Sequence, residues 1–524
     1  MKILVADKIS EEGLAVLRQS KKIEVVVKAG LDEQALAAAV ADAEALIIRS
    51  GAKVTAEVIR AGSKLKVIGR AGVGVDNVDL EAATERGIVV MNTPDGNTVA
   101  AAEHTFGLLL ALARNIPTAY NSLKSGKWER SSFVGTELDG KTLGIVGLGR
   151  IGMNVARFAR AFRMKVIACD PFIAQERAEE ADIELVSQEE LFSRSDFVTL
   201  HTPVTEKTRG MVNAKMLGLM KPTARLINCA RGALVEEEAL EQALKEGKIA
   251  GAALDVFSTE PPDRPGLIGR DRVVVTPHLG ASTREAQIGV GVQIAHQVLA
   301  ALEKGAYDNA VNMPVPDLAQ LERFRSFLDL TERVGVFMAE FLSGGIQKVV
   351  ISAAGACSEA LQPLKLSLLK GLLTPLTGGN VNFINAAYLA RQRGINVDGL
   401  VTDKTDYTNM VNCRVKTDKE SCSIDGTVFG DELPRIVRIN EFYMDFDPNG
   451  HLLVIKNADV PGIIGKVGTC LGESGLNIGE YCLGREAKRR NTLSLVSVDS
   501  EIPDSVLEEI RSIEGIHYAK RVTV

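Results

Sequence analysis

Up to residue 304, short apolar runs rich in β-branched residues alternate with stretches in which apolar residues recur at helical spacing. KILVAD (2–7), ALIIRS (45–50) and LKVIGRAG (65–72) are such runs, and EEGLAVLRQ (11–19) is one of the amphipathic stretches between them. This alternation is typical of parallel strands joined by helices that cover the sheet. We therefore predict an α/β fold whose first lobe is flavodoxin-like.

A second series of the same kind begins at residue 141. We expect its strands at 141–147, 165–170, 196–202, 224–230, 251–257 and 272–278. The first of them runs into GLGRIG (147–152), a G-x-G-x-x-G turn that is the fingerprint of a Rossmann-like dinucleotide-binding lobe. Such a turn normally opens its domain, whereas here it follows the whole of the first series.

A nested arrangement accounts for the position of this turn. The helix predicted over 282–305 is long enough to cross from one lobe to another. The chain can then return to its first lobe after completing the second. We predict a discontinuous first domain formed by residues 1–97 and 285–314, and a dinucleotide-binding domain formed by residues 98–284.

Two further modules are predicted in the rest of the chain. PVPD (314–317) and FDPNG (446–450) place proline or glycine between periodic stretches, as linkers do. They delimit an intervening α+β domain at 318–446 and a last domain at 451–524. The last domain shows the order strand, helix, strand, strand, helix, strand, which predicts a ferredoxin-like βαββαβ unit.

The composition excludes several classes of function. The 524 residues, 46% of them hydrophobic, agree with three or four domains of roughly 150 residues each. A net charge of −6 without blocks of like charge argues against a nucleic acid or a membrane as partner. Seven cysteines without a C-x-x-C pair argue against a metal site and against disulfides. They favour a reducing, cytoplasmic location.

The glycine-rich turn and the strand after it predict a bound dinucleotide. Gly147 permits the tight turn, Gly149 lets the backbone approach a pyrophosphate, and Gly152 allows the helix to pack on the strand. Asp170 ends the next strand, where a carboxylate accepts hydrogen bonds from the adenosine ribose and repels a 2′-phosphate. This carboxylate favours NAD over NADP.

A base for a substrate hydroxyl is sought among six histidines. His201 and His278 both end predicted strands, at the edge where open α/β sheets bind their ligands. His278 is the better candidate, because in VVVTPHLGAST it stands between a proline and a glycine on a rigid turn. The other four are expected to be packed in helices or to belong to the tail: His104, His296, His451 and His517.

Carboxylates and arginines at other strand ends complete the candidate site. An imidazole is a better base when a carboxylate stabilises its protonated form. Glu260 in STEPPD is the candidate for this partner, and Asp255 in the preceding strand is its rival. Arg231 in NCARG offers a planar fork that suits a substrate carboxylate.

The first lobe offers a second set of anion-binding groups. Arg49 and Arg70 end two of its predicted strands. Gly72 and Gly74 follow in GVGV, where glycines let backbone amides approach an anion. Glycines that only form a turn are an equally good explanation of this loop.

A resemblance to a known family rests on three residues, Arg231, Glu260 and His278, and on the motifs GLGRIG, INCARG, AALDVF and TPHLGAST. With them, the chain resembles the D-isomer-specific 2-hydroxyacid dehydrogenases. Two tail domains make it similar to the long type within that family. The resemblance extends over essentially the whole chain. It implies NAD-dependent oxidation of 3-phospho-D-glycerate to 3-phosphooxypyruvate, the first step of L-serine biosynthesis, by a homo-oligomer expected to be a tetramer.

The resemblance also implies roles for single residues. Arg231 would bind the substrate carboxylate and carbonyl, His278 would act as acid and base, and Glu260 would tune that histidine. Arg49, Arg70 and the loop Gly72, Val73 and Gly74 would line the substrate pocket at its phosphate end. Contacts to NAD would come from the glycines of the turn and from Arg150, Ile151, Asp170, Thr202, Cys229, Ala230, Asp255 and Gly280.

In the tail, the resemblance identifies the last module as an ACT domain and the one before it as an allosteric substrate-binding type of domain. Asp459 in NADVPG and Asn477 in GLNIG match positions that contact serine, which implies feedback inhibition by L-serine. GREAKRRN (484–491) departs from the family, which has glycines after GR.

Two other functions are compatible with the same motifs. One is that of a dehydrogenase for a different 2-hydroxy acid, such as 2-hydroxyglutarate. The other is that of a non-catalytic, NAD-sensing binding protein, since one branch of the superfamily binds peptides with the same three residues. That branch ends in a disordered extension, whereas residues 318–524 are periodic here.

Overall fold

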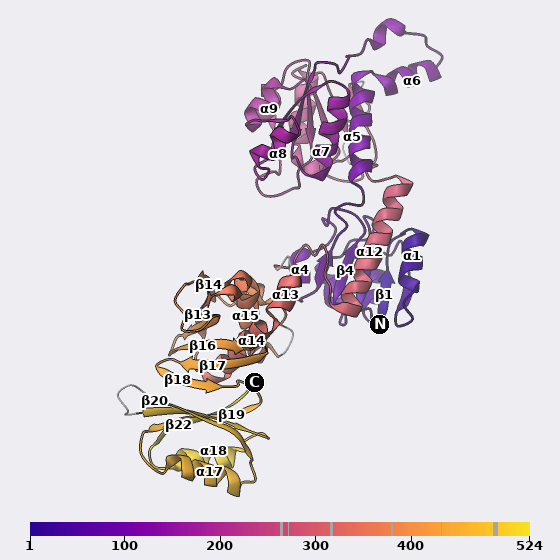
Figure 1. Ribbon diagram of the computed structural model, residues 1–524. Helices are drawn as coiled ribbons and strands as arrows, with labels where there is room; N and C mark the ends of the chain where they lie inside the picture. The colour runs from indigo at the N-terminus through magenta and orange to yellow at the C-terminus, as the bar shows by residue number, and fades with distance from the viewer. Residues whose placement is uncertain (263–265, 271, 315–317, 379–380, 431, 486–490) are drawn as a thin grey trace.

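The computed structural model describes residues 1–524 apart from 263–265, 271, 315–317, 379–380, 431 and 486–490. Four β-sheets lie in a row through the described residues (Figure 1). The sheet formed by residues 142–275 lies at one end of this row, and the sheet formed by residues 451–523 lies at the other. Most of the linker predicted at 314–317 lies outside the described residues.

The first sheet consists of five parallel strands in the order β2-β1-β3-β4-β5. All four residues of β3 are buried, as expected for a parallel sheet covered on both faces. The strands are β1 (Lys2–Val5), β2 (Glu24–Val27), β3 (Ala45–Ile48), β4 (Val67–Arg70) and β5 (Val89–Met91). The helices between them are α1 (Glu11–Arg18), α2 (Glu33–Val40), α3 (Ala56–Ala61) and α4 (Leu80–Glu85).

Helix α12 (Arg284–Lys304) returns the chain to this first sheet. Val290, Ile294 and Val298 on α12 belong to the same hydrophobic core as Ile3 and Val67 of the sheet. The helix passes so close to α1 that the two backbones nearly touch. A Cβ atom at Gly13 would lie 2.7 Å from the carbonyl oxygen of Gly291. The chain therefore leaves the first sheet after β5 and rejoins it only after the second sheet is complete.

The second sheet has seven parallel strands in the order β12-β11-β10-β9-β6-β7-β8. The order reverses beside β6, and open α/β sheets bind ligands outside the strand ends at such a point. The strands are β6 (Thr142–Val146), β7 (Lys165–Cys169), β8 (Glu184–Leu185), β9 (Phe197–Leu200), β10 (Arg225–Asn228), β11 (Gly251–Leu254) and β12 (Val273–Val275). Its helices are α5 (Thr98–Ala113), α7 (Arg150–Ala161), α8 (Gln175–Glu180), α9 (Gln188–Arg194), α10 (Ala214–Leu219) and α11 (Glu237–Lys245).

The third sheet is mixed, with the order β14-β13-β15-β16-β17-β18. Only the pair of β13 and β14 is parallel in it. Its strands are β13 (Ile346–Ala354), β14 (Asn396–Val401), β15 (Met410–Thr417), β16 (Ser421–Phe429), β17 (Leu433–Ile439) and β18 (Phe442–Phe446). The helices of this part are α13 (Leu318–Arg323), α14 (Arg325–Phe341), α15 (Leu361–Thr377) and α16 (Ala386–Gln392).

The fourth sheet is antiparallel, in the order β20-β21-β19-β22. Leu452 and Leu495 on one of its faces join the core around α14 and α15, and Leu453 and Val496 on the other face join the core under its own helices. Its elements follow the predicted βαββαβ order: β19 (His451–Ala458), α17 (Ile463–Glu473), β20 (Ile478–Arg485), β21 (Asn491–Val498), α18 (Asp504–Ser512) and β22 (Ile516–Thr523).

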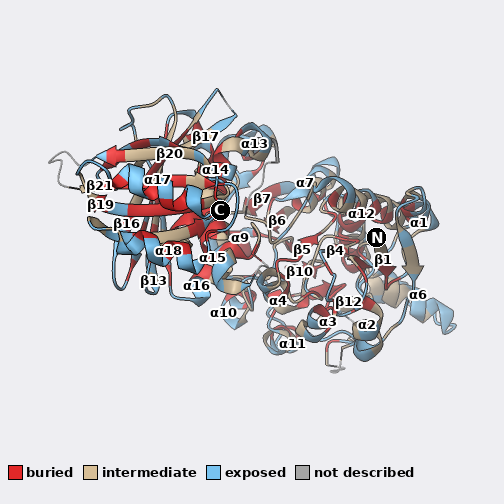
Figure 2. Ribbon diagram, turned by 90° about the horizontal axis from the view of Figure 1, so that it is seen from below, coloured by how far each residue is buried: buried red, intermediate tan, exposed pale blue. Residues whose placement is uncertain are grey.

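The mixed α/β fold with two parallel sheets, predicted from the sequence, is confirmed. Burial follows the layers, since the strands are mostly buried and the outer helix faces are exposed (Figure 2). Helix α6 (Ile116–Lys124) was not predicted, and it projects from the second sheet with the segment that follows it. None of the helices in the described part of the chain is long and apolar enough to span a membrane.

The contact between α1 and α12 yields a test of the nested chain path. Gly13→Ala places a methyl group against backbone, which cannot rotate away, so we expect the free energy of unfolding to fall by about 1 to 3 kcal/mol. Calorimetry of the purified chain measures this as a lowered transition temperature. Gly107→Ala is the control, because this exposed glycine of α5 has open space around it and alanine favours a helix. Equal effects of the two substitutions would contradict the contact.

Candidate active site

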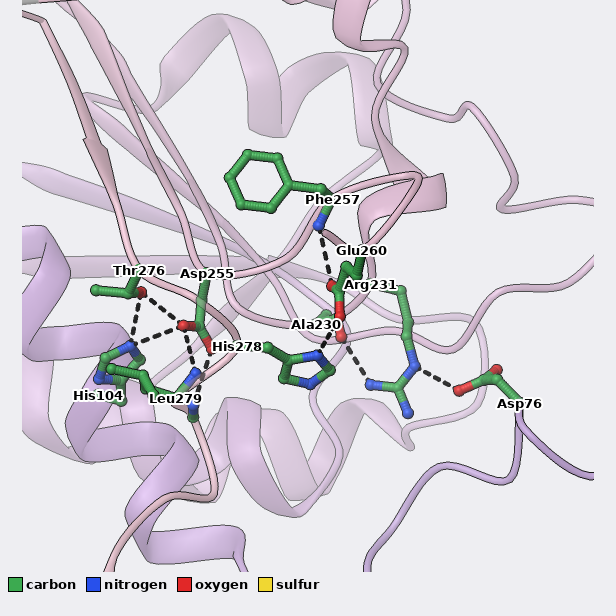
Figure 3. A network of polar contacts seen from close by, with 11 residues as sticks. Asp76, His104, Ala230, Arg231, Asp255, Phe257, Glu260, Thr276, His278 and Leu279 are labelled. Carbon is green, nitrogen blue, oxygen red and sulfur yellow. Dashed lines mark hydrogen bonds and ion pairs between the residues drawn. The ribbon is translucent and has the colours of Figure 1, made fainter. Parts of the chain in front are cut away.

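Loops that follow β4, β10, β11 and β12 bring side chains of the two parallel sheets together (Figure 3). Nδ1 of His278 lies 2.7 Å from Oε2 of Glu260, and both side chains are partly exposed. The other oxygen of Glu260, Oε1, accepts a hydrogen bond from the amide of Phe257 at 3.1 Å. The structure thus places Glu260, and not its rival Asp255, against the imidazole of His278.

Asp255 has a different position, beneath the loop that carries His278. Its buried carboxylate accepts hydrogen bonds from the amides of Leu279 at 2.7 Å and Gly280 at 2.8 Å, and from Oγ1 of Thr276 at 2.6 Å. The amide of His278 donates to the backbone oxygen of Asp255 at 2.8 Å. These bonds hold His278 in a left-handed backbone conformation, with φ of 55°. Such a conformation is strained for a residue other than glycine and persists only where its surroundings fix it.

His104 is a polar partner that the sequence analysis missed. It lies on α5, and its Nε2 is 3.1 Å from both Oδ1 of Asp255 and Oγ1 of Thr276 (Figure 3). Its setting among alanines and leucines favoured a packed structural histidine. One signal pointed the other way: Asp255 follows the apolar strand GAAL directly, and a buried carboxylate needs donors from somewhere.

The pKa values of Asp255 and His201 indicate which of these two groups carries a charge near neutral pH. Desolvation raises the pKa of the Asp255 carboxyl, but the hydrogen bonds from His104, Thr276 and the loop amides outweigh it, and the pKa is lowered. Asp255 is therefore an anion near neutral pH. Desolvation lowers the pKa of His201 to about 4, so this second histidine of the strand ends is neutral there.

Arg231 connects the second sheet to the first. Its Nε donates to Oδ2 of Asp76 at 2.7 Å, and its Nη1 donates to the backbone oxygen of Ala230 at 2.7 Å. Asp76 belongs to the loop after β4 (Figure 3). Nη2 lies directly over Gly74 in the same loop, where a Cβ atom would be only 1.7 Å away. A side chain at position 74 would therefore displace the guanidinium of Arg231 from this place.

The arginines of the first lobe stand near Arg231. Desolvation, followed by the repulsion of Arg231, lowers the pKa of Arg70 to about 10, which still leaves it charged near neutral pH. The buried Nε of Arg70 has no hydrogen-bond partner among the described residues. Its Nη1 lies over Gly72, whose φ is 148°. Arg49 adds a third guanidinium to the same surroundings. Such a group of charges attracts an anion.

The glycine-rich turn has the geometry expected of a dinucleotide site. Gly147 has φ of 95°, and a Cβ at Gly152 would lie 2.1 Å from the oxygen of Gly147. Nothing lies within 4 Å of a Cβ built at Gly149, the N-cap residue of α7, so the helix N-terminus faces open space. This open helix end fits a pyrophosphate. The carboxylate of Asp170 accepts hydrogen bonds from the amides of Leu148 and Phe172 at 2.7 and 2.8 Å.

The remaining predicted cofactor residues surround the same strand ends. Arg150 pairs through Nε with Asp95, at 2.6 Å from Oδ1. Burial raises the pKa of the Cys229 thiol to about 12, so it is not a thiolate nucleophile. Ile151, Thr202 and Ala230 are half-buried, and Gly280 is buried. A cavity of about 380 Å³ adjoins the Glu260–His278 pair and is lined by Phe257, Pro262, Ile268 and Val275.

The two predicted effector residues lie elsewhere, in the part of the chain that forms the fourth sheet. Oδ2 of Asp459 is 3.4 Å from Nε of Arg485, and Nδ2 of Asn477 donates to Oδ2 of Asp499 at 2.8 Å. Most of the unusual segment GREAKRRN, residues 486–490, lies outside the described residues. Among the described residues, no three His, Cys, Asp or Glu side chains form a group that could hold a metal ion.

Comparison with known protein families gives two matches. The model of the NAD binding domain of D-isomer specific 2-hydroxyacid dehydrogenases matches residues 106–280. The model of the D-3-phosphoglycerate dehydrogenase intervening domain matches residues 323–440.

Relatives match almost the whole chain. D-3-phosphoglycerate dehydrogenase of Synechocystis sp. is 43% identical over 99% of this chain and 94% of its own length. The enzyme of the same name from Methanocaldococcus jannaschii is 43% identical over 98% of both chains. The one from Bacillus subtilis is 38% identical over 99% of both.

Solved structures match a part of the chain. A protein from Thermus thermophilus is 39% identical with a TM-score of 0.55, and covers 59% of this chain and 100% of its own. D-lactate dehydrogenase from Aquifex aeolicus, in complex with NAD and lactic acid, is 30% identical with a TM-score of 0.53, and covers 58% of this chain and 96% of its own.

The hydrogen bonds of Asp255 predict a local effect on the His278 loop. Asp255→Ala leaves buried donors without an acceptor, so we expect a loss of about 2 to 4 kcal/mol in unfolding free energy. Amide hydrogen exchange should accelerate at Leu279 and Gly280. Because the folded pKa of Asp255 lies below the ordinary 3.8, its contribution is present above that pH and is lost as the pH falls through the folded value. The variant should lack this part of the acid sensitivity.

Asp139→Ala is the matched control, because it removes an exposed carboxylate that pairs with Arg163 on the surface. Exposed pairs contribute about 0 to 1 kcal/mol, so little change is expected. Unaltered exchange at Leu279 and Gly280 in the Asp255 variant would contradict the role of this carboxylate.

Proposed function

The chain belongs to the D-3-phosphoglycerate dehydrogenases, within the D-isomer-specific 2-hydroxyacid dehydrogenase family, and we propose that it oxidises 3-phospho-D-glycerate to 3-phosphooxypyruvate with NAD. It is an NAD-dependent oxidoreductase. The observation that carries the proposal is the pair of Glu260 and His278, which stands beside Arg231 between the two parallel sheets.

His278 is proposed as the base. Since its Nδ1 faces a carboxylate 2.7 Å away, Nδ1 carries the proton and Nε2 is the free acceptor. Nε2 takes the proton of the substrate hydroxyl, and Glu260 stabilises the imidazolium that forms. NAD, when bound, would supply the acceptor for the hydride from the carbon that bears this hydroxyl. The proton and the hydride together account for the oxidation of the alcohol to a ketone.

The arginines are proposed to bind the two anionic ends of the substrate. Arg231 stands beside His278 and offers its fork to the carboxylate. Arg49 and Arg70 lie in the other lobe and suit the phosphate, which carries more charge than one guanidinium neutralises. The open end of α7 at Gly149 and the carboxylate of Asp170 would hold the pyrophosphate and the adenosine ribose of NAD.

The division of the chain and its assembly belong to the proposal. We propose the four domains 1–97 with 285–314, 98–284, 318–446 and 451–524, which agree with the four sheets. The chain is proposed to form a homotetramer, supported by exposed apolar side chains on and after the projecting helix α6, namely Ile116, Tyr120, Leu123, Trp128 and Val134. Seven free cysteines fit a cytoplasmic location.

The catalytic proposal is tested by following NADH formation with 3-phospho-D-glycerate and NAD. His278→Ala should lower kcat by about 10²- to 10⁴-fold, because the base is lost. Glu260→Gln should lower it less, since the base remains and only its partner changes. His201→Asn is the control, as a histidine with a pKa of about 4 is a poor base near neutral pH. A His278→Ala enzyme with normal kcat would refute the assignment.

The last domain is proposed to be an ACT domain that binds L-serine and inhibits the enzyme. Asp459 and Asn477 are the proposed contacts. One buried polar atom two residues before Asp459 in the chain, Oδ1 of Asn457, has no hydrogen-bond partner among the described residues. An unpaired buried polar atom is unfavourable, and a polar amino-acid ligand could pair with it.

We expect L-serine to inhibit NADH formation by the unaltered chain. Asp459→Ala and Asn477→Ala should each raise the serine concentration for half-inhibition by about tenfold, because each removes a hydrogen bond to a charged ligand. Each variant is compared with its own rate in the absence of serine. Glu508→Ala, an exposed residue of α18 paired with Arg511, is the control. Activity that serine does not affect would end this regulatory proposal and leave the catalytic one intact.

A further inference from the structure

The contact between Asp76 and Arg231 joins the two lobes at the proposed substrate site. Asp76 lies in the loop after β4, and Arg231 lies in the loop after β10. Oδ2 of Asp76 accepts a hydrogen bond from Nε of Arg231 at 2.7 Å. Figure 3 shows the guanidinium with His278 on one side and Asp76 on the other.

A contribution to the stability of the folded chain does not account for this ion pair. About two-thirds of the Asp76 side chain is exposed, at 68%, and exposed pairs add little to folding. The pair also engages an arginine that the proposed function needs for another anion. A role in the orientation of the guanidinium accounts for both facts.

The hydrogen bonds of Arg231 leave one edge of its fork available. A guanidinium carries five N–H donors in a fixed plane. Asp76 engages Nε, and the oxygen of Ala230 engages one N–H of Nη1. The N–H groups of Nη1 and Nη2 that point away from Nε form the end-on edge, which matches the two oxygens of a carboxylate. With Nε and Nη1 both held, the plane of the fork cannot rotate about its long side chain.

The loop that carries Asp76 is itself fixed. Nδ2 of Asn92 donates to the oxygen of Val73 at 2.6 Å, and the amide of Thr93 donates to the oxygen of Gly72 at 3.0 Å. At the other end, Nδ2 of Asn77 donates to the oxygens of Arg49 and Ala52, both at 2.7 Å. Asp76 is therefore an acceptor on a supported loop, although its carboxylate is exposed.

We propose that Asp76 is a positioning residue for the substrate carboxylate. It holds Arg231 through Nε across the two lobes, so that the end-on edge of the fork faces the space beside His278. Since the acceptor and the donor belong to different lobes, the arginine is oriented in this way only when the lobes are close together. This inference rests on the proposed function, because it assigns the ligand of Arg231 from it.

Charge and position predict opposite results at Asp76. If the carboxylate acted through its charge alone, its removal would strengthen the binding of an anionic substrate. If it acts as a fixed acceptor, its removal frees the fork and weakens binding. Asparagine separates the two effects, because its side-chain oxygen can still accept from Nε without a charge. Glutamate separates them in the other direction, because it keeps the charge and displaces the oxygen by one methylene.

The experiment measures kcat and KM for 3-phospho-D-glycerate in the full-length chain, with NAD binding followed by calorimetry. Asp76→Ala should lower kcat/KM about tenfold or more through a raised KM, as expected for loss of a hydrogen bond to a charged group. Asp76→Asn should stay within about threefold of the unaltered chain, and Asp76→Glu should resemble the alanine variant. The affinity for NAD should not change. Asp139→Ala serves as the control for loss of an exposed carboxylate.

Three results would overturn the inference: an unchanged Asp76→Ala enzyme, a lowered KM in both the alanine and the asparagine variants, or an asparagine variant as impaired as alanine. If Asp76→Ala fails to fold, as judged by lost NAD binding, the asparagine and glutamate variants decide the question. An unaltered chain that neither oxidises 3-phospho-D-glycerate nor binds it in the presence of NADH would end the proposed function and this inference together. An active chain with an unaffected Asp76→Ala variant would end only the inference.

Discussion

The carboxylate of Asp255 is the interaction on which the geometry of the site depends. It is buried and ionised, and it accepts from two consecutive loop amides, a threonine hydroxyl and the imidazole of His104. An isolated buried charge is strongly unfavourable, but one with this many donors is stabilised where it stands. The loop of His278 must therefore follow the position of this carboxylate. His278 keeps a strained backbone conformation as a consequence.

Two carboxylates in one short segment thus have different tasks, and their burial separates them. Asp255 is enclosed, and its donors fix its orientation, so it supports the loop. Glu260 is partly exposed and bonds one backbone amide and the imidazole, so it can respond to the charge of His278. A rigid carboxylate underneath and a responsive one beside the imidazole are both required if a histidine is to change protonation state without moving.

The sequence was sufficient for the parts of the site that depend on local pattern. Strand ends of parallel sheets lie at one edge, so the strands that precede Arg231, Asp255 and His278 could be placed together from periodicity alone. Residues with partners in other segments could not be placed in this way. Periodicity gives the face of α5 on which His104 lies, but not that this face meets Thr276. Likewise, the spacing of residues could not show whether Asp255 or Glu260 is the partner of the His278 imidazole. That depends on how the segment after β11, which carries Glu260, folds back onto His278.

The contact of Asp76 with Arg231 was beyond sequence reasoning for a related reason. The two residues are far apart in the chain, and they meet because α12 returns to the first sheet and sets how the lobes approach. The glycines in this region then have a common explanation. Gly13 and Gly291 allow the helices to cross closely, while Gly72 and Gly74 let two guanidinium groups lie directly on the backbone of the loop after β4. A glycine-rich loop, equally compatible with a plain turn when seen in the sequence, therefore provides the space in which the positive charges of both lobes converge.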